Sequence, residues 1–437
     1  MKNCLLKSTV ALAILSSSYA IETDAVTKAW NTKMAEFNMT PKYHGFCYSA
    51  PNGDILGPNP HRRVRLASTS KLITTLMAIE KLGLDYEYTT SFYYDGENLH
   101  IKGDNDPVMS KRKLFFLISQ LNNLGITKIK NLTFDKEFKV FSMVEDIAHS
   151  EKRPSIELTT KSLKDYFTVS EWNLLKTAYE KFITETPQEV IDELQIRTSL
   201  EDIQLSVDSI SHVDKNPLKE ENLKTYEMIS PIIAKYLKIM NIDSNNYIAD
   251  QVFDKIGGEK EYKKYIEKLV ADKFGDYKSL REEFDKKEDN FAFYTGSGLN
   301  TTRNGQRVDN YATCAIMVEL MKVLDEKLDS ITREMQEVVA VPGVDGGTFK
   351  TRLNTPRLAR SIVAKTGTLK HTSTLLGKVS AEQGDLFFGM FHQMAGWKGN
   401  AKIVQNMMVS ELLDNYGGPK KFEYKKEFFF PASAPLK

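Results

Sequence analysis

The chain has 437 residues, a formal net charge of +1, 41% hydrophobic residues and 10% aromatic residues. This length predicts two or three globular domains with ordinary hydrophobic cores. The near-neutral charge argues against a nucleic-acid partner. No stretch reaches the roughly 20 apolar residues of a membrane-spanning helix, so we expect no stable membrane anchor.

The N-terminus has the pattern of an export signal. Lys2 and Lys7 give a positive start, residues 11–15 are apolar, and residues 18–20 form a small-x-small cleavage pattern. We therefore predict that residues 1–20 are a signal peptide and that the mature protein is periplasmic or secreted. Its removal changes the formal charge from +1 to −1, because two lysines are lost.

Two of the three cysteines, Cys47 and Cys314, remain after export. In an oxidising compartment they could form a disulfide, although two separate buried thiols fit the sequence equally well. Cys4 lies before the apolar stretch, not after it where a lipidated cysteine would stand, so no lipid anchor is expected.

The first elements lead into a buried helix. Residues 43–48 favour a strand, residues 51–54 a turn, and a helix is predicted from Ser68 to a C-terminal cap at Gly83. The helix prediction rests on apolar residues at helical spacing, namely Leu72, Ile73, Leu76, Met77, Ile79 and Leu82.

Residues 85–220 are predicted to form an inserted α+β domain. The pattern indicates strands over 89–102, a helix over 113–122, a strand over 126–134, and a helical patch over 155–210. Four apolar residues of this patch fall on one face of a helix, namely Trp172, Leu175, Tyr179 and Phe182. We interpret this face as part of the hydrophobic core and not as a ligand-binding surface.

The rest of the chain alternates helices and strands. Ser230 followed by Pro231 predicts a helix start, and a second helical block begins near Tyr247. Strands are predicted at residues 360–365, 375–379 and 386–392, and an amphipathic helix at 400–416. The three phenylalanines at 428–430 have no explanation from the sequence.

Ser68 and Lys71 are the first candidate catalytic pair. Their spacing of three at a helix start places a hydroxyl and an amine on one face about one turn apart. The amine can accept the hydroxyl proton if burial or a second cation lowers its pKa. Alone, this four-residue pattern arises by chance and usually marks a solvated helix start.

Two further motifs support the pair. Lys365-Thr366-Gly367-Thr368, at a strand end, supplies a second cation, hydroxyls suited to a substrate carboxylate, and a glycine that permits close backbone approach. Ser244-Asn245-Asn246, between two helical blocks, offers a hydroxyl for proton relay and an amide. Each motif by itself would be assigned to a loop, a helix cap or a sheet edge.

The order of the three motifs, separated by 176 and 121 residues, is improbable by chance. The sequence here resembles the serine penicillin-recognising superfamily, and more closely its class C low-molecular-mass penicillin-binding proteins, the D-Ala-D-Ala carboxypeptidase/endopeptidase family. Further similar blocks are residues 102–107, 296–299 and 341–348.

The resemblance implies a role for each motif residue. Ser68 would be the acylated nucleophile, Lys71 the general base and Ser244 the proton relay. It further implies that Asn246 supports the lysine by hydrogen bonding. Substrate carboxylate binding would fall to Lys365, Thr366, Gly367 and Thr368, with the oxyanion held by the backbone N–H groups of Ser68 and Thr368.

The implied chemistry needs no metal or other cofactor, and the seven histidines show no metal-ligand spacing. The expected partners are peptidoglycan peptides as substrates and β-lactams as inhibitors. The sequence leaves open whether the enzyme removes a terminal D-alanine, cuts the D,D cross-link, or does both.

Three departures from the family pattern stand out. Asn245 replaces the usual aspartate of the second motif. Arg303 is displaced by three intervening residues, so its role toward a substrate carboxylate is uncertain. The stretch from Ser68 to Ser244 is short for a family that often has two nested extra domains, which predicts a reduced insertion and an open cleft.

The fold predicted is therefore an α/β catalytic domain of the DD-peptidase/β-lactamase type, an antiparallel sheet flanked by helices with a helical subdomain. It would span residues 21–84 and 221–437, interrupted by the inserted domain at 85–220. A β-lactamase of the same fold is one alternative, although no Glu-x-x-x-Asn segment lies between the second and third motifs. A non-catalytic peptidoglycan-binding relative is the other.

Overall fold

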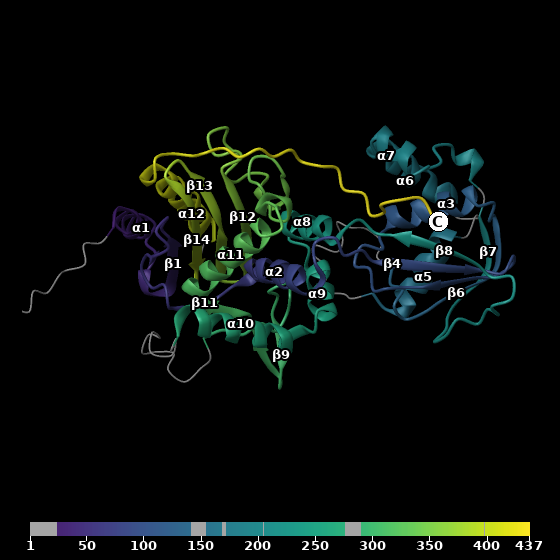
Figure 1. Ribbon diagram of the computed structural model, residues 1–437, viewed down its shortest axis with the longest axis horizontal. Coiled ribbons are helices and arrows are strands. Elements are labelled where there is room, and N and C mark those ends of the chain that lie inside the picture. The colour runs from purple at the N-terminus through teal and green to yellow at the C-terminus, as the bar shows by residue number, and fades with distance from the viewer. Residues whose placement is uncertain (1–23, 141–153, 168–171, 204, 276–289, 397) are drawn as a thin grey trace, which may run out of the picture.

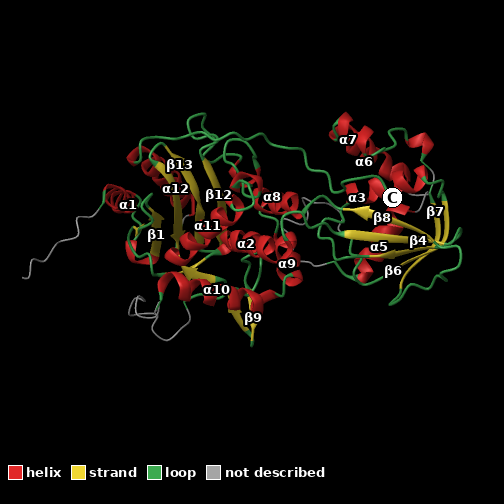
Figure 2. Ribbon diagram, in the orientation of Figure 1, coloured by secondary structure: helices red, strands yellow, loops and turns green. Residues whose placement is uncertain are grey.

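The computed structural model describes residues 24–437 except 141–153, 168–171, 204, 276–289 and 397. This part of the chain forms two lobes, each built on a five-stranded sheet (Figure 1 and Figure 2). None of its helices combines the length and the apolar character that a membrane span requires.

The sheet of the first lobe is antiparallel throughout, in the order β12-β13-β14-β1-β2. Its strands are β1 (His44–Ser49), β2 (Ile55–Leu56), β12 (Ile362–Leu369), β13 (Thr372–Ala381) and β14 (Gly384–His392). Alternate residues of a strand face opposite sides, so Phe46 and Tyr48 enter one core while Cys47 enters another. Both faces of this sheet are therefore buried.

Helices cover the two faces of this sheet. α1 (Ala25–Glu36) and α12 (Lys398–Asn415) pack on one face, and α11 (Cys314–Asp329) packs on the other. Two short strand pairs complete the lobe: β3 (Arg63–Arg65) with β11 (Tyr311–Thr313), and β9 (Thr301–Arg303) with β10 (Gln306–Val308).

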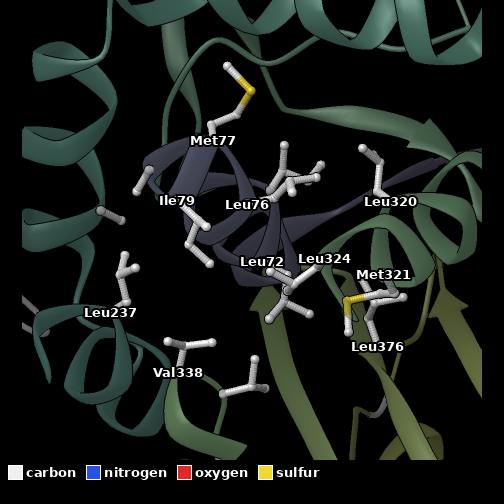
Figure 3. Packing of buried hydrophobic residues seen from close by; sticks show 14 of the residues in the cluster. Leu72, Leu76, Met77, Ile79, Leu237, Leu320, Met321, Leu324, Val338 and Leu376 are labelled. Atoms are coloured by element: carbon white, nitrogen blue, oxygen red, sulfur yellow. The ribbon is translucent and has the colours of Figure 1, made fainter. Parts of the chain in front are cut away.

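α2 (Ser70–Leu82) runs through the centre of the lobe and ends at Gly83, as predicted. Figure 3 shows Leu72 and Leu76 of α2 packed among side chains from α11, β13 and α8. The helical subdomain beside α2 consists of α8 (Ile233–Asp243), α9 (Asn246–Lys255) and α10 (Gly258–Phe274). A helix buried on most sides holds its first turn in a fixed place, and that turn follows directly on Ser68.

The second lobe has a mixed sheet in the order β7-β6-β5-β4-β8. Its strands are β4 (Thr89–Tyr94), β5 (Leu99–Lys102), β6 (Lys128–Phe134), β7 (Ser206–His212) and β8 (Lys224–Ile229). Its helices are α3 (Lys111–Asn123), α5 (Ile156–Phe167), α6 (Trp172–Glu185) and α7 (Gln188–Glu193). Tyr179 and Phe182 of α6 lie in its core, which confirms their interpretation as packing residues.

Two local predictions are wrong. The helical patch expected to reach residue 210 ends earlier, because Ser206–His212 is a strand paired with β6. Ser230 is not a helix cap, because its hydroxyl accepts the N–H of Tyr88 and donates to the Pro231 carbonyl, and α8 begins only at Ile233.

The boundary predicted at residue 220 precedes β8, which pairs with β4 inside the second sheet. The C-terminal segment also crosses from the first lobe to the second (Figure 1). Phe429 packs against the core of the first lobe, whereas Phe430 lies in the core of the second. The end of the chain pairs with β8 through the backbone of Glu227 and Lys437. Phe429 and Phe430 thus fasten one lobe to the other.

Cys47 of β1 and Cys314, the first residue of α11, form a disulfide. The bond ties the helix to the sheet that it covers and closes a sequence separation of 267 residues. The sequence left open a disulfide or two separate buried thiols, and the structure has the disulfide.

Candidate active site

The turn that carries Ser68 is held between two glycines. Ala67 adopts a left-handed backbone with φ of 50°, which is strained for a residue with a Cβ. A Cβ on Gly298 would lie 1.8 Å from the Ala67 carbonyl oxygen, and a Cβ on Gly367 would lie 2.9 Å from the Ser68 nitrogen. The blocks around 298 and 367 therefore approach the serine turn more closely than any side chain would permit.

Lys71 lies one turn after Ser68 and is fully buried. Its Nζ is 3.2 Å from Ser68 Oγ, 2.7 Å from Asn246 Oδ1 and 2.8 Å from the Ser297 carbonyl oxygen. Burial lowers the pKa of Lys71 from 10.5 to about 7, while the negative charge of Asp250 acts in the opposite direction. The neutral amine has two N–H groups for the two carbonyl oxygens, which leaves its lone pair for the serine hydroxyl.

The second motif joins two helices, and each of its residues has a different place. Ser244 ends α8 in a left-handed conformation with φ of 59°. Asn245 caps α9, since its side chain accepts the N–H of Ile248 at 2.9 Å. Asn246 is the first residue of α9 and reaches Lys71. Asparagine and aspartate cap helices equally well, so the departure at 245 leaves this turn intact.

Lys365 lies on β12, an edge strand of the first sheet, and is also fully buried. Its Nζ donates to the Thr366 carbonyl at 3.0 Å. Burial and the nearby Lys71 hold the pKa of Lys365 well below its usual range, while Asp243 acts in the opposite direction. Thr366 is buried and Thr368 is exposed. An edge strand with a hydroxyl exposed at its end can pair with an extended peptide.

Two polar residues at this site were missed from the sequence. Asp250 Oδ1 accepts the N–H of Ser297 at 2.8 Å, and could have been suspected from its place one helical turn after Asn246. Asn310 donates to Ser70 Oγ and to the Thr295 carbonyl, so it joins the start of α2 to the residue that precedes the block at 296–299. No local pattern in the sequence marks Asn310.

Arg303 is not brought to the motif residues. It lies exposed on the β9–β10 hairpin, where its guanidinium pairs with Glu259 of α10 at 2.8 Å. The carboxylate partner of Arg303 is thus a residue of the same chain and not a substrate carboxylate.

A cavity of about 1010 Å³ lies between α8, α3 and the C-terminal segment. Its lining reaches Asp243 but includes neither Ser68 nor Lys365. Within the described part of the chain there is no group of three or more histidines, cysteines or carboxylates that could hold a metal ion.

The sequence profile of the D-Ala-D-Ala carboxypeptidase 3 (S13) family matches residues 52–150 and 183–412. The chain belongs to this family. It is therefore a serine hydrolase of the D,D-peptidase type, as the order of the three motifs predicted. A search among curated proteins found no match.

Solved structures agree with this assignment. The predatory endopeptidase Bd0816 from Bdellovibrio bacteriovorus, in complex with the immunity protein Bd3460, is 27% identical with a TM-score of 0.73. Bd3459, a predatory peptidoglycan endopeptidase from the same organism, is 28% identical with a TM-score of 0.72. In both comparisons, 90% of this chain and 98% of the other are covered.

Penicillin-binding protein 4 from Haemophilus influenzae, complexed with a β-lactam, is 16% identical with a TM-score of 0.57, over 90% of this chain and 100% of that one. Together with the observed antiparallel sheet and its flanking helices, these matches confirm the predicted fold class.

Proposed function

We propose that the chain hydrolyses D,D-peptide bonds of peptidoglycan stem peptides through an acyl-enzyme on Ser68. The observation that carries the proposal is the buried Lys71 amine, which lies 3.2 Å from the Ser68 hydroxyl and is held by two carbonyl oxygens. A serine needs such a base within hydrogen-bond reach to act as a nucleophile at neutral pH.

In the acylation step, Ser68 Oγ forms a bond to the carbonyl carbon of the scissile peptide while its proton passes to the neutral amine of Lys71. The backbone N–H groups of Ser68 and Thr368 stabilise the resulting oxyanion. The carbon–nitrogen bond then breaks, and a proton from the Lys71 ammonium reaches the leaving amine through the hydroxyl of Ser244. Gly367 supports this arrangement, because its missing side chain lets β12 lie against the Ser68 nitrogen.

In the second step, water attacks the acyl carbon and gives its proton to Lys71. Ser68 Oγ leaves and takes that proton back, so the enzyme returns to its starting state. The product is a peptide with a new D-alanine carboxylate.

Lys365, Thr366 and Thr368 are proposed to bind the carboxylate that follows the scissile bond. In the free site the Lys365 ammonium is disfavoured by burial, and a substrate carboxylate would restore its charge. Binding and protonation of Lys365 are thus expected to be coupled. Arg303 has no part in this proposal, since Glu259 already holds it.

We include both endopeptidase and carboxypeptidase activity in the proposal. Bd3459, which is similar over 90% of this chain, is a peptidoglycan endopeptidase and has been obtained acylated by penicillin G. The short insertion is also expected to leave room on both sides of a D,D cross-link. We further propose that β-lactams acylate this chain at the same serine, and that residues 1–20 direct it to the periplasm or the exterior.

Digestion of purified sacculi tests the proposal. The wild type should release un-cross-linked muropeptides, identified by mass, and Ser68→Ala should release none. Ser330→Ala is the matched control, because it removes an exposed hydroxyl at the end of α11, away from the motif residues, and should keep activity. Full activity of Ser68→Ala would overturn the proposal.

The balance of activities follows from kcat/KM for a cross-linked dimer and for a pentapeptide monomer. A preference for the monomer beyond about a hundredfold, equivalent to about 2.7 kcal/mol, would exclude the endopeptidase part.

A further inference from the structure

α9 carries two polar side chains that reach Lys71 by different routes. Asn246 and Asp250 are four residues apart and so lie on one face of the helix. Asn246 accepts directly from Lys71 at 2.7 Å. Asp250 acts through Ser297, accepting its N–H at 2.8 Å, while the Ser297 carbonyl accepts from Lys71 at 2.8 Å.

Ser297 needs such an anchor because no regular structure holds it. It lies fully buried in the segment 296–299, which belongs to neither a helix nor a strand. A Cβ on Gly296 would lie 2.2 Å from the Ala249 carbonyl oxygen, so the segment touches α9 directly. The bond to Asp250 holds the peptide unit before Ser297, and the N–H of Gly298, which shares a peptide unit with the Ser297 carbonyl, donates to Thr295 Oγ1 at 3.2 Å. Together these two bonds fix the direction of the Ser297 carbonyl.

The charges around Lys71 come from several elements. Asp250 on α9 favours its charged form. On β12, burial and the nearby Lys71 lower the pKa of Lys365, while Asp243 at the end of α8 acts in the opposite direction. Tyr262 on α10 has a pKa raised by burial and by Asp250, so it is neutral. Asp250 is therefore the carboxylate whose charge acts on Lys71 itself.

We infer that Asp250 is a positioning residue: it orients the Ser297 carbonyl that, with Asn246, holds the two N–H groups of Lys71 and directs its lone pair at Ser68. The inference rests on the proposed function, since it has a meaning only if Lys71 is the base. It assigns Asp250 two separable effects, one through its hydrogen bond and one through its charge.

Two variants separate these effects. Asp250→Asn keeps an oxygen that can accept the Ser297 N–H but removes the charge. Its acylation rate at the high-pH plateau should stay within about threefold of wild type, and the acidic limb of the pH–rate profile should move to lower pH. Asp250→Ala loses the hydrogen bond as well, and its plateau rate should fall by about tenfold to a hundredfold. The probe is a fluorescent penicillin, and the fold of each variant is checked by thermal unfolding.

Asp254→Asn is the matched control. It removes a carboxylate from the same helix one turn further along, whereas the N–H of Ser297 is held by Asp250. Its profile should match the wild type in both plateau and limb.

Two results would overturn the inference: an unmoved acidic limb in Asp250→Asn, or a plateau for Asp250→Ala equal to that of wild type. A limb that moves equally in Asp254→Asn would also overturn it, because the effect would then be one of general charge. Failure of the proposed function looks different, since in that case the wild type itself would not be labelled, or Ser68→Ala would still be labelled.

Discussion

The low pKa of Lys71 makes a quantitative prediction about the general base. Burial lowers this pKa from 10.5 to about 7. At pH 7 the shift raises the neutral fraction of the amine from about 3 in 10⁴ to about one half, a gain of about 10³ in active base. The acylation rate of the wild type should therefore rise with pH up to about 7 and level off above it.

Lys71→Arg removes the base but keeps the positive charge, because a guanidinium does not lose its proton in this range. We expect the acylation rate at pH 8 to fall by about 10² to 10⁴, which is about 3–5 kcal/mol of activation free energy. The remaining rate should lack the limb near pH 7. The assay is the second-order rate constant for labelling by a fluorescent penicillin, measured from about pH 5 to pH 9.

Lys81→Arg is the control for this substitution. Lys81 lies on the same helix, but its ammonium pairs with Glu261 on the outside of the lobe at 2.7 Å, so the change should leave labelling unaltered. Labelling of Lys71→Arg within about threefold of wild type, or a limb near pH 7 that persists in this variant, would refute the assignment of Lys71 as the base.

Three further predictions concern stability. Because the pKa of Lys71 is lowered in the fold, the unfolded chain holds a proton between about pH 7 and pH 10.5 that the folded chain has released. The free energy of unfolding of Lys71→Met should therefore exceed that of wild type most below pH 7, and this difference should shrink as the pH rises to 10.5. A difference in urea denaturation that does not change with pH would contradict this. Gly298→Ala should cost several kcal/mol and abolish penicillin labelling because of the 1.8 Å approach to Ala67, whereas Gly96→Ala, also at positive φ but with nothing within 4 Å, should cost only about 1 kcal/mol. Equal losses of stability for the two variants in thermal unfolding would show that the close approach of Gly298 to Ala67 does not hold the serine turn. Phe430→Ala should lower the free energy of unfolding by about 3–5 kcal/mol and make the C-terminal segment sensitive to protease, and a loss below about 1 kcal/mol would show that the segment does not fasten the lobes.

The sequence predicts the elements whose burial leaves a regular pattern. The helix after Ser68 has apolar residues on most of its turns and a glycine at its end, and both features are where the structure has them. The three strands after residue 360 carry enough apolar residues to be recognised as well. The motif residues Ser68, Lys71, Asn246 and Lys365 converge because these elements pack on one another.

Two of the missed strands lie where the pattern is weak. β7 and β8 are the two edge strands of their sheet, and their residues are mostly polar and half-exposed, so neither shows the alternation of a buried strand. Asn310 acts through contacts with distant segments, which no local spacing reveals, whereas the place of Asp250 one turn after Asn246 is a local signal. Ser230 has the sequence of a helix cap, yet a tertiary hydrogen bond to Tyr88 takes its hydroxyl.

The most direct test of the central claim is to locate the penicilloyl group by mass spectrometry after reaction with penicillin G. Trypsin cuts after Arg65 and Lys71 and releases residues 66–71, which contain Ser68, Thr69 and Ser70. This peptide should gain one penicilloyl group, and fragmentation should place the group on Ser68. A penicilloyl group on any other residue, or unmodified protein after prolonged reaction, would contradict the account.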